Sequence, residues 1–289
     1  MTTTSVLTVD AAPRGVTRPR LRATSRWAAF ATLTRRRIAL SAHTPREIIV
    51  PLLTPILFAD VIAPALARSM GGHGGIDYLS YVAVGTVGLL VPLSCVLGGI
   101  GMIVDRESGA QRDLLAAPMP RSTLVFGNLS VALMVSGLQV VALMGAALLR
   151  GASFATSVSG IAWAVGAVLG VAVAMHSVAE ILAARIPRQE EYVGVAPGIA
   201  LVPWFFAGSF FRITAMPIGL TWLARVLPVT HALALLRYGL VDHRGTGLYD
   251  IWGMHSTTTM ALLSLGVVVA FAAGMLTLSI RVFTRAAIH

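Results

Sequence analysis

The sequence predicts an all-α integral membrane protein with six transmembrane helices, an N-terminal interfacial amphipathic helix and a re-entrant helical hairpin before the last span. Composition is the first observation behind this prediction, because 56% of the 289 residues are hydrophobic and only 12% are charged. Soluble domains contain about 25% charged residues, and their surface has to stay wet. The second observation is that the apolar residues form six long runs, more than one soluble core could bury.

Two elements are expected before the first span. Residues 1–24 form a polar tail that lacks the apolar stretch of a signal peptide, and we expect this tail to be disordered in the cytoplasm. Ser25–Ala42 is expected to form an amphipathic helix, because Trp27, Phe30 and Ile38 project to one side at about 100° per residue and Arg36 to the other. Such a helix suits the headgroup layer, although a weakly amphipathic, solvated tail is the alternative. Residues 25–289 are expected to form one transmembrane domain.

Six segments reach the length of about 20 apolar residues that a helix needs to cross the hydrocarbon core. They are Ile48–Leu66, Tyr78–Val104, Leu124–Leu149, Val158–Ala184, Val193–Phe211 and Thr257–Ile280. Between the last two lies Arg212–Ser256, which contains two shorter apolar stretches, Ile218–Leu227 and Thr230–Leu240. Each is about half a membrane thick, so we expect re-entrant or interfacial helices there.

The arginines predict the orientation in the membrane. All 22 basic residues are arginine. With the N-terminus in the cytoplasm, 16 of them fall on the cytoplasmic side and six outside, as the positive-inside rule requires. We therefore expect both termini in the cytoplasm. This placement also accounts for the net charge of +10, so we expect no nucleic-acid partner.

Metal ligation is not expected. Cys95 is the single cysteine and lies inside an apolar span, and the seven histidines are scattered without the spacing of helical ligand pairs. One cysteine allows neither a disulfide within the chain nor a cysteine-based metal site.

Ionisable residues inside the spans are candidates for a translocation path. Asp60 lies in the first span, and His176 and Glu180 lie four residues apart on one face of the fourth. Such groups are costly in hydrocarbon and normally face protein or water. They could line a polar path or relay protons. Alternatively they form an interhelix or intersubunit hydrogen bond, or Glu180 lies close enough to the cytoplasm to be solvated.

A polar segment, Asp105–Arg121, separates the second and third spans on the cytoplasmic side. Its charges alternate in sign, and Leu114 and Leu115 form an apolar step before Pro118. A short helix ended by Pro118 would present charges and a small apolar knob to a cytoplasmic partner. A solvated turn is the alternative.

These residues also carry a family resemblance. Arg106-Glu107-Ser108-Gly109, followed by Leu114-Leu115-Ala116-Ala117-Pro118 and Arg121, resembles the cytoplasmic signature of type-2 ABC exporter permeases. Phe205–Phe211, Met216-Pro217 and Leu227–Arg237 are similar to that family's fifth-span end, short re-entrant pair and proline-centred turn. The resemblance covers roughly residues 25–285 and is strongest to the daunorubicin-resistance and Nod-factor exporter permeases.

The resemblance implies a permease of the bacterial plasma membrane that exports an amphiphilic cargo such as a drug, antibiotic, lipid or glycoconjugate. Two permeases, identical or related, would pair within the lipid, and each would engage a soluble ATPase subunit that binds ATP and Mg²⁺. This chain would bind no cofactor. The implied ATPase-coupling residues are Arg106, Glu107, Gly109, Arg112, Leu115 and Arg121, and those of the re-entrant region are Phe206, Gly208, Pro228, His231 and Arg237. Arg212 departs from the family, where proline or an apolar residue is frequent, and could reach the outer headgroups.

The residue content also bears on other functions. A phosphate-binding G-x-x-x-x-G-K-[ST] loop requires lysine, which the sequence lacks, so we expect ATP hydrolysis in another protein and no enzyme activity here. The main alternative is a proton-coupled secondary transporter that uses Asp60, His176 and Glu180, but it leaves Asp105–Arg121 unexplained. A lipid-modifying enzyme would need paired carboxylates or histidines at a membrane interface, and none is evident in the sequence.

Overall fold

The computed structural model describes residues 31–36, 38–39, 53, 56–57, 78–116 and 121–286. In this part of the chain all regular structure is helical, which confirms the predicted class. The elements are α4 (Tyr78–Leu97), α5 (Ile100–Glu107), α6 (Ala110–Ala116), α7 (Arg121–Leu149), α8 (Val158–Arg185), α9 (Gln189–Phe206), η2 (Ile213–Ala215), α10 (Ile218–Val226), α11 (Pro228–Leu240), α12 (Thr246–Trp252) and α13 (Thr257–Ala286).

Four stretches of the described chain are long and apolar enough to cross a membrane. They are Tyr78–Glu107, Ser122–Leu149, Val158–Arg185 and Thr257–Thr284, which match the second, third, fourth and sixth predicted spans. The number becomes five if α10 and α11 together form one broken span. The predicted first span, with Asp60, lies almost wholly outside the described residues, as does the tail 1–24. The count of six therefore stays a prediction.

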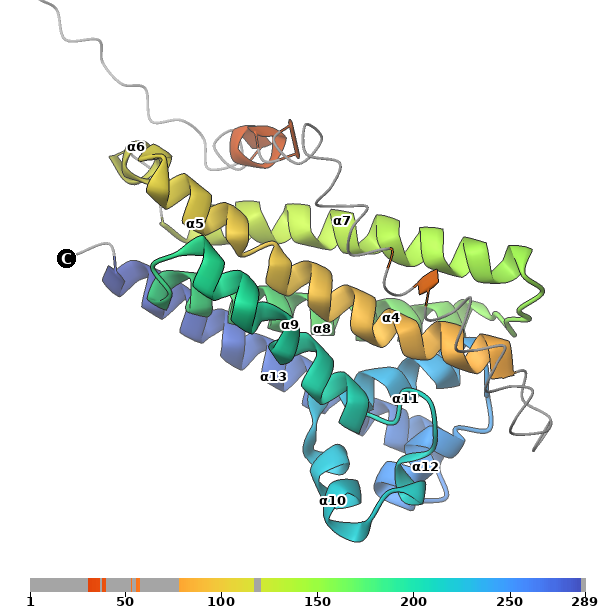
Figure 1. The fold of residues 1–289 in the computed structure, drawn as a ribbon. Helices are drawn as coiled ribbons and strands as arrows, with labels where there is room; N and C mark the ends of the chain where they lie inside the picture. The colour runs from red at the N-terminus through yellow and green to blue at the C-terminus, as the bar shows by residue number, and fades with distance from the viewer. Residues whose placement is uncertain are drawn as a thin grey trace, which may run out of the picture.

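The fifth predicted span differs from the helix in the structure. α9 has 18 residues, begins with Glu190 and Glu191 in its first turn and contains Pro197 and Pro203. Its length is about 27 Å, and the acidic first turn shortens the apolar part further. α9 nevertheless lies against α4 in the bundle (Figure 1). It is shorter and more polar than the four helices above, so a full crossing at this position is not confirmed.

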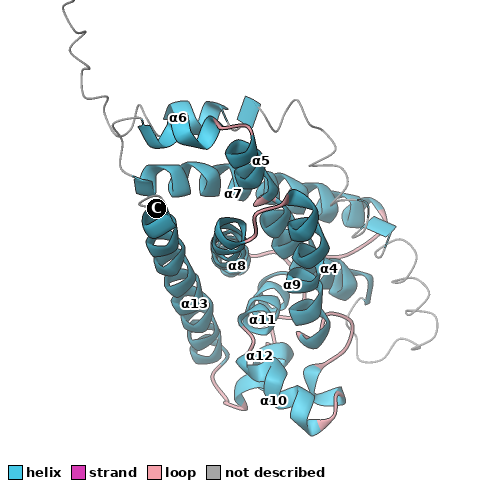
Figure 2. Cartoon of the chain, turned by 60° about the vertical axis from the view of Figure 1, so that its left-hand side comes forward, coloured by secondary structure: helices cyan, strands magenta, loops and turns pink. Residues whose placement is uncertain are grey.

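The bundle is built around α4 and α8. α8 contacts α13, α11 and α4, and Figure 2 shows it near the centre, with α7, α13, α11, α9 and α4 around it. In the span that α4 begins, 67% of the most apolar window is buried, whereas the corresponding share is 28% for α7 and 22% for α13. α7 and α13 therefore leave more of their apolar surface uncovered within one chain than α4 does.

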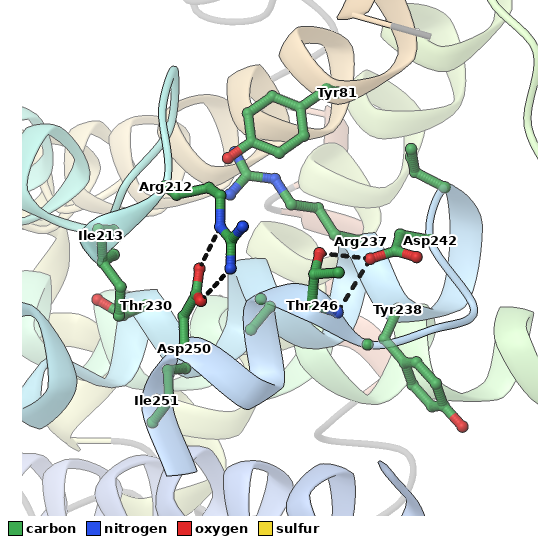
Figure 3. Close-up of a pocket in the computed structure, with 15 residues that line it drawn as sticks. Tyr81, Arg212, Ile213, Thr230, Arg237, Tyr238, Asp242, Thr246, Asp250 and Ile251 are labelled. Atoms are coloured by element: carbon green, nitrogen blue, oxygen red, sulfur yellow. Dashed lines mark hydrogen bonds and ion pairs between the residues drawn. The ribbon is translucent and has the colours of Figure 1, made fainter. Parts of the chain in front are cut away.

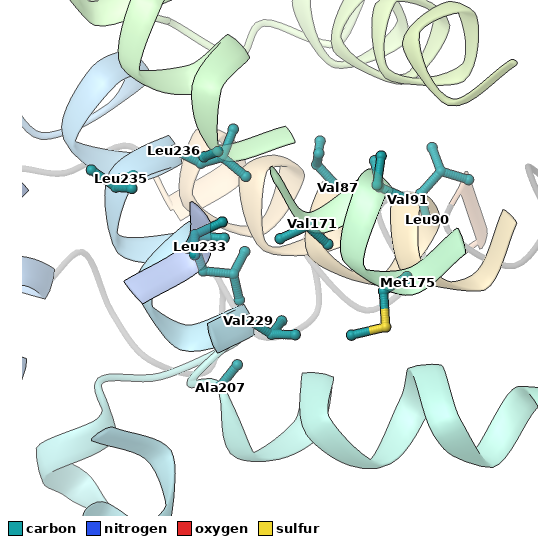
Figure 4. Close-up of a cluster of buried hydrophobic side chains, with 14 of the residues drawn as sticks. Val87, Leu90, Val91, Val171, Met175, Ala207, Val229, Leu233, Leu235 and Leu236 are labelled. Atoms are coloured by element: carbon teal, nitrogen blue, oxygen red, sulfur yellow. The ribbon is translucent and has the colours of Figure 1, made fainter. Parts of the chain in front are cut away.

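Aliphatic side chains from α4, α8 and α11 fill the core. Val87 and Val91 of α4 lie near Val171 and Met175 of α8, and Leu233 of α11 packs into the same cluster (Figure 4). Close packing of small and branched side chains is how membrane helices associate, since lipid tails compete equally well for apolar surface. The core thus holds the three central helices together independently of any polar site.

The two ends of the bundle differ in their elements. Figure 1 shows α5 and α6 at one end, where the last helix α13 also finishes, and α10 and α12 at the other. We refer to these as the α6 end and the α10 end.

At the α10 end, α10 and α11 have almost the predicted limits, but the two helices meet at 81°. Pro228 is the first residue of α11, and Leu227 before it has an extended backbone. A residue before proline avoids the helical region, so the bend is dictated locally. α10 and α11 are therefore bent at nearly a right angle and do not form an antiparallel hairpin. A re-entrant position in the membrane stays a prediction. α12, which the sequence did not suggest, is a short helix between the left-handed glycines Gly245 and Gly253.

Candidate functional site

The polar segment after α5 folds as a sharp elbow at the α6 end. α5 ends at Glu107, and the short helix expected there is α6, which begins at Ala110. Gly109 joins them with a φ of 78°, a left-handed backbone that favours glycine. The amide of Arg112 donates to the Gly109 carbonyl at 3.0 Å, which closes the turn. The sequence therefore makes a defined elbow here, in place of the solvated turn that was the alternative.

The elbow turns its charges outward and an apolar side chain inward. Glu107, Ser108 and Arg112 are exposed. Leu114 is half-buried and packs against a cluster that includes Leu124 and Phe283, so it anchors α6 instead of forming a knob for a partner. The side chains of two further coupling candidates, Leu115 and Arg121, lie outside the described residues, as does Pro118.

Arg106, another coupling candidate, points away from the exposed face. Its Nη1 donates to the Ala183 carbonyl at 2.8 Å, and its Nη2 donates to the carbonyls of Ile186 at 2.7 Å and Pro187 at 3.0 Å. The last carbonyls of a helix have no partner within the helix, and a cation there is favourable. Arg106 therefore caps the C-terminal end of α8. No local pattern could have revealed this, because Ala183 is 77 residues away in the sequence.

The neighbouring residue, Asp105, faces the N-terminal helix. Arg36 Nη2 lies 3.2 Å from Asp105 Oδ1, with exposures of 38% and 17%, and Thr34 shares a hydrogen bond of 3.1 Å with Ser130 of α7. Leu33 joins the apolar cluster of α7 and α13. The described part of the predicted amphipathic helix, residues 31–36 and 38–39, thus lies against the bundle, whereas Trp27 and Phe30 lie outside the described residues.

His176 and Glu180 lie inside the bundle. Their side chains are 3% and 1% exposed, and His176 Nε2 is 3.5 Å from Glu180 Oε1. Ser279 of α13 donates to Glu180 Oε2 at 2.5 Å. In the described structure, both ring nitrogens of His176 and Oε1 of Glu180 lack a hydrogen-bond partner. The Ser279 contact supports the interhelix interpretation, and a role in transport stays a prediction.

At the α10 end, Arg237 holds the chain where it leaves α9. Arg237 is 8% exposed, and its Nη1 and Nη2 donate to the carbonyls of Gly208 at 2.9 Å and Ser209 at 2.7 Å. Its guanidinium carbon lies 3.6 Å from the centre of the Tyr81 ring, a cation–π contact. The sequence singled out Arg237 but not Tyr81, which is brought to it by the packing of α4 against α11.

The other predicted residues of this region have structural positions as well. His231 Nε2 lies 2.9 Å from the Arg225 carbonyl, and His231 Nδ1 lies 3.2 Å from Ser264 Oγ. Phe206 is the last residue of α9, and the buried Gly208 follows it with a φ of 75°. Together with Pro228, these residues shape the connection from α9 to α11.

Arg212 pairs with a carboxylate of α12. Its Nε donates to Asp250 Oδ2 at 2.8 Å and its Nη2 donates to Asp250 Oδ1 (Figure 3). This hydrogen bonding raises the pKa of Arg212 above its usual value. Arg212 therefore ties α12 to the chain after α9, although its side chain is still 58% exposed.

A small cavity lies beside this ion pair. Tyr81, Arg237, Asp242 and Thr246 are among its lining residues, and its volume is about 30 Å³ (Figure 3). That space holds one or two water molecules. It is too small for an amphiphilic cargo, so the cavity is not a cargo site in this conformation. Across the described chain, no three His, Cys, Asp or Glu side chains gather closely enough to hold a metal ion.

Comparison with known families decides the class. The model of the ABC-2 type transporter family matches residues 28–241, well over half of the chain. The chain belongs to the ABC-2 type transporter family. An ABC-2 permease is the membrane component of a transporter, not a catalytic domain, and this family normally works with an ABC ATPase. No curated protein matches this ABC-2 permease.

The matched region of the ABC-2 permease includes both ends described above. It runs from the N-terminal helix through the α5–α6 elbow to the end of α11. The resemblance seen in the sequence is thereby confirmed at the level of the family. The apolar helices of the chain and its family together identify it as a multi-pass membrane protein.

Proposed function

We propose that this chain is the permease subunit of an ATP-driven exporter that moves an amphiphilic cargo out across a bacterial plasma membrane. A separate ABC ATPase subunit binds ATP and Mg²⁺ and docks at the α6 end, which faces the cytoplasm together with both termini. The observation that carries this proposal is the α5–α6 elbow. Its turn is closed by the hydrogen bond from the Arg112 amide to the Gly109 carbonyl, and Glu107, Ser108 and Arg112 are exposed on it, as contact with a soluble partner requires.

The outer surface of the bundle supports an assembly with a second permease in lipid. α7 and α13 are apolar, yet only 28% and 22% of their most apolar windows are buried within one chain. Exposed apolar faces of this extent need lipid or another protein to cover them. A second permease copy, or a related permease, would cover part of this surface and close a path for an amphiphile between the two halves.

A proton-coupled secondary transporter is the second candidate. The specific observation in its favour is the buried pair His176 and Glu180, whose facing atoms lack hydrogen-bond partners within the described chain. The ATP-driven exporter is the better supported of the two, because the family normally works with an ABC ATPase and the exposed charges of the elbow suit contact with a soluble partner.

Transport in inverted membrane vesicles separates these candidates. The full chain, expressed with its partner ATPase, should transport a fluorescent amphiphile in an ATP-dependent, vanadate-sensitive manner, and the ATPase should co-purify in mild detergent. Glu180→Gln should leave ATP-driven transport close to the wild-type rate. Transport that needs no ATP, and that a protonophore or Glu180→Gln abolishes, would overturn the proposal in favour of the proton-coupled candidate.

A further inference from the structure

The exposed charges at the α6 end come from two turns that are distant in the sequence. Glu107 and Arg112 belong to the α5–α6 elbow. The second turn, residues 186–188, joins α8 to α9 and is called the α8–α9 turn here. Arg188 lies in it, and Arg185, Glu190 and Glu191 flank it; all four side chains are exposed. Of these two turns, the elbow alone was predicted to contact the ATPase.

We infer that Arg106 clamps the α8–α9 turn to the elbow, so that both turns form one rigid docking platform for the ATPase subunit. The identity of the partner rests on the proposed function, whereas the clamp rests on contacts within this chain. Arg106 is then a positioning residue, because it acts on the partner through the turn that it holds.

The clamp consists of three hydrogen bonds from one planar group. The Arg106 guanidinium donates to carbonyls of three different residues, Ala183, Ile186 and Pro187, at 2.7 to 3.0 Å. α8 ends at Arg185, and the backbone of Ile186 is already extended. Arginine presents several N–H donors in a fixed fork, so it can hold a helix end and the following turn at once. Lysine cannot reproduce this geometry.

A second contact holds the same two elements further into the bundle. The Tyr192 hydroxyl, in the first turn of α9, donates to the Val96 carbonyl at 2.6 Å, where α4 gives way to α5. A Cβ on Gly99 would lie 2.2 Å from this hydroxyl, so only glycine leaves room for it. α5 is therefore held near both of its ends by residues at the α8–α9 junction, and the two move as one body.

The opposite side of α5 is held as well. Asp105 precedes Arg106 and pairs with Arg36 of the N-terminal helix at 3.2 Å. Adjacent side chains of α5 thus reach in two directions, one toward the N-terminal helix and one toward the α8–α9 turn. A force applied to the elbow is delivered through α5 to α8, the helix that contacts α13, α11 and α4.

Arg188 is the charged residue at the α8–α9 turn whose side chain does least to stabilise a helix end. Arg185 ends α8, and Glu190 and Glu191 lie in the first turn of α9, so each complements the dipole of its helix. Arg188 occupies the N-cap position of α9, its side chain makes no capping hydrogen bond, and it is exposed. A cation at a helix N-terminus is electrostatically unfavourable, so helix capping does not account for this side chain. The platform assigns it contact with acidic groups of the ATPase subunit.

The clamp is tested by distance measurements on the full chain without its partner. Spin labels at Ser108→Cys and Arg188→Cys report on the gap between the two turns, and the native Cys95 is buried and resists labelling. The distance distribution should be narrow in the parent. It should broaden and shift to longer distances in Arg106→Gln, and Arg106→Lys should be intermediate, which keeps the test valid if Arg106→Gln folds poorly. An unchanged distribution in both variants would overturn the clamp.

The platform is tested by binding of the ATPase subunit to the permease in lipid nanodiscs. Arg188→Glu should weaken the association about tenfold, through lost charge complementarity. The matched control is Arg281→Glu, an exposed arginine of α13 outside both turns, which should bind like the wild type. Equal affinity of the two variants would overturn the docking role of the α8–α9 turn.

The two experiments separate the inference from the proposed function. If the wild-type permease binds no ATPase at all, the proposed function fails, and the spin-label distances still decide whether Arg106 acts as a clamp. If the ATPase binds and drives transport, but Arg106→Gln changes neither the distances nor the ratio of cargo moved to ATP hydrolysed, the proposed function stands and the inference fails.

Discussion

The two ends of the bundle use the same device in different surroundings. At the α6 end Arg106 donates to three carbonyls where α8 ends, and at the α10 end Arg237 donates to two carbonyls just after α9 ends. Arg106 is half-buried beside exposed charges, whereas Arg237 is 8% exposed and lies against Tyr81. Arg106 thus lies at a surface that a partner can reach, whereas Arg237 stabilises contacts inside the protein.

The largest effect on stability is expected at the α10 end. Arg237→Met should lower the free energy of unfolding by about 3 kcal/mol, because it removes two hydrogen bonds from a charged donor. The buried Ser209 carbonyl would lose the hydrogen bond from Arg237, and the Gly208 carbonyl would keep only the long one from the Tyr81 hydroxyl at 3.4 Å. Arg106→Met should lower the free energy of unfolding by only about 1 kcal/mol, because Pro187 in the α8–α9 turn is exposed and water can replace the lost hydrogen bond there. Thermal unfolding in detergent measures both.

Arg244→Met is the control for this comparison, because Arg244 is exposed and the change should stay within about 0.5 kcal/mol. Equal losses for Arg237→Met and Arg106→Met would show that the two ends do not differ as described.

The second effect is a loss of transport activity and is expected from substitutions at the α6 end. Glu107→Ala combined with Arg112→Ala should reduce vanadate-sensitive transport about tenfold, the result of losing roughly 1.4 kcal/mol of contact with the ATPase, while membrane insertion stays normal. Transport per inserted molecule is the measurement. Unchanged transport would remove the elbow from the coupling surface.

The third effect isolates the backbone of the elbow. Gly109→Ala should destabilise the turn by about 1 kcal/mol, because the residue has a φ of 78°. No atom lies within 4 Å of the added Cβ, so crowding plays no part. Hydrogen exchange of the α6 amides should report the local loosening.

Gly194→Ala in α9 is a matched control, since it also has open space but an ordinary helical backbone, and alanine there should stabilise the helix. If both substitutions loosened their helices alike, the left-handed turn would not be the cause.

The smallest effect is expected at the ion pair of the α10 end. Arg212→Gln should cost about 1 kcal/mol or less, because the arginine is 58% exposed even though Asp250 is 5% exposed. The melting temperature should fall less with rising salt in this variant than in the wild type, since the pair that salt screens is gone. A loss as large as that of Arg237→Met would contradict the ranking.

Prediction from the sequence succeeded where the signal was local. Hydropathy located four of the spans, and the family resemblance placed a proline-centred turn at Pro228, where the structure bends. The left-handed turn at Gly109 was not predicted as such. Prediction was less accurate at α9, where Glu190 and Glu191 shorten the apolar run, and it missed α12, whose seven residues are too few to show a period. The span around Asp60 lies outside the described residues and stays a prediction.

Roles of individual residues were harder to predict. Arg106 and Glu107 are neighbours in one polar run and were both assigned to the coupling surface, yet Arg106 turns inward to α8 and Glu107 is exposed. Leu114 likewise packs into the bundle instead of projecting from it. Which side of a short helix faces the protein depends on the neighbouring helices, and the polar run contains no information about them.

By itself, the sequence determined that this protein is helical and lies in a membrane, that it belongs to the ABC-2 type, and where its polar elbow falls, because composition, hydropathy and short motifs are properties of neighbouring residues. Only the tertiary structure decided that Arg106 holds the α8–α9 turn, that Trp204 donates to the Gly85 carbonyl and that Arg237 lies on Tyr81. The first two contacts join residues 77 and 119 positions apart. They exist because helix packing brings backbone carbonyls of distant segments within reach of side-chain donors, which must find a partner once they leave water.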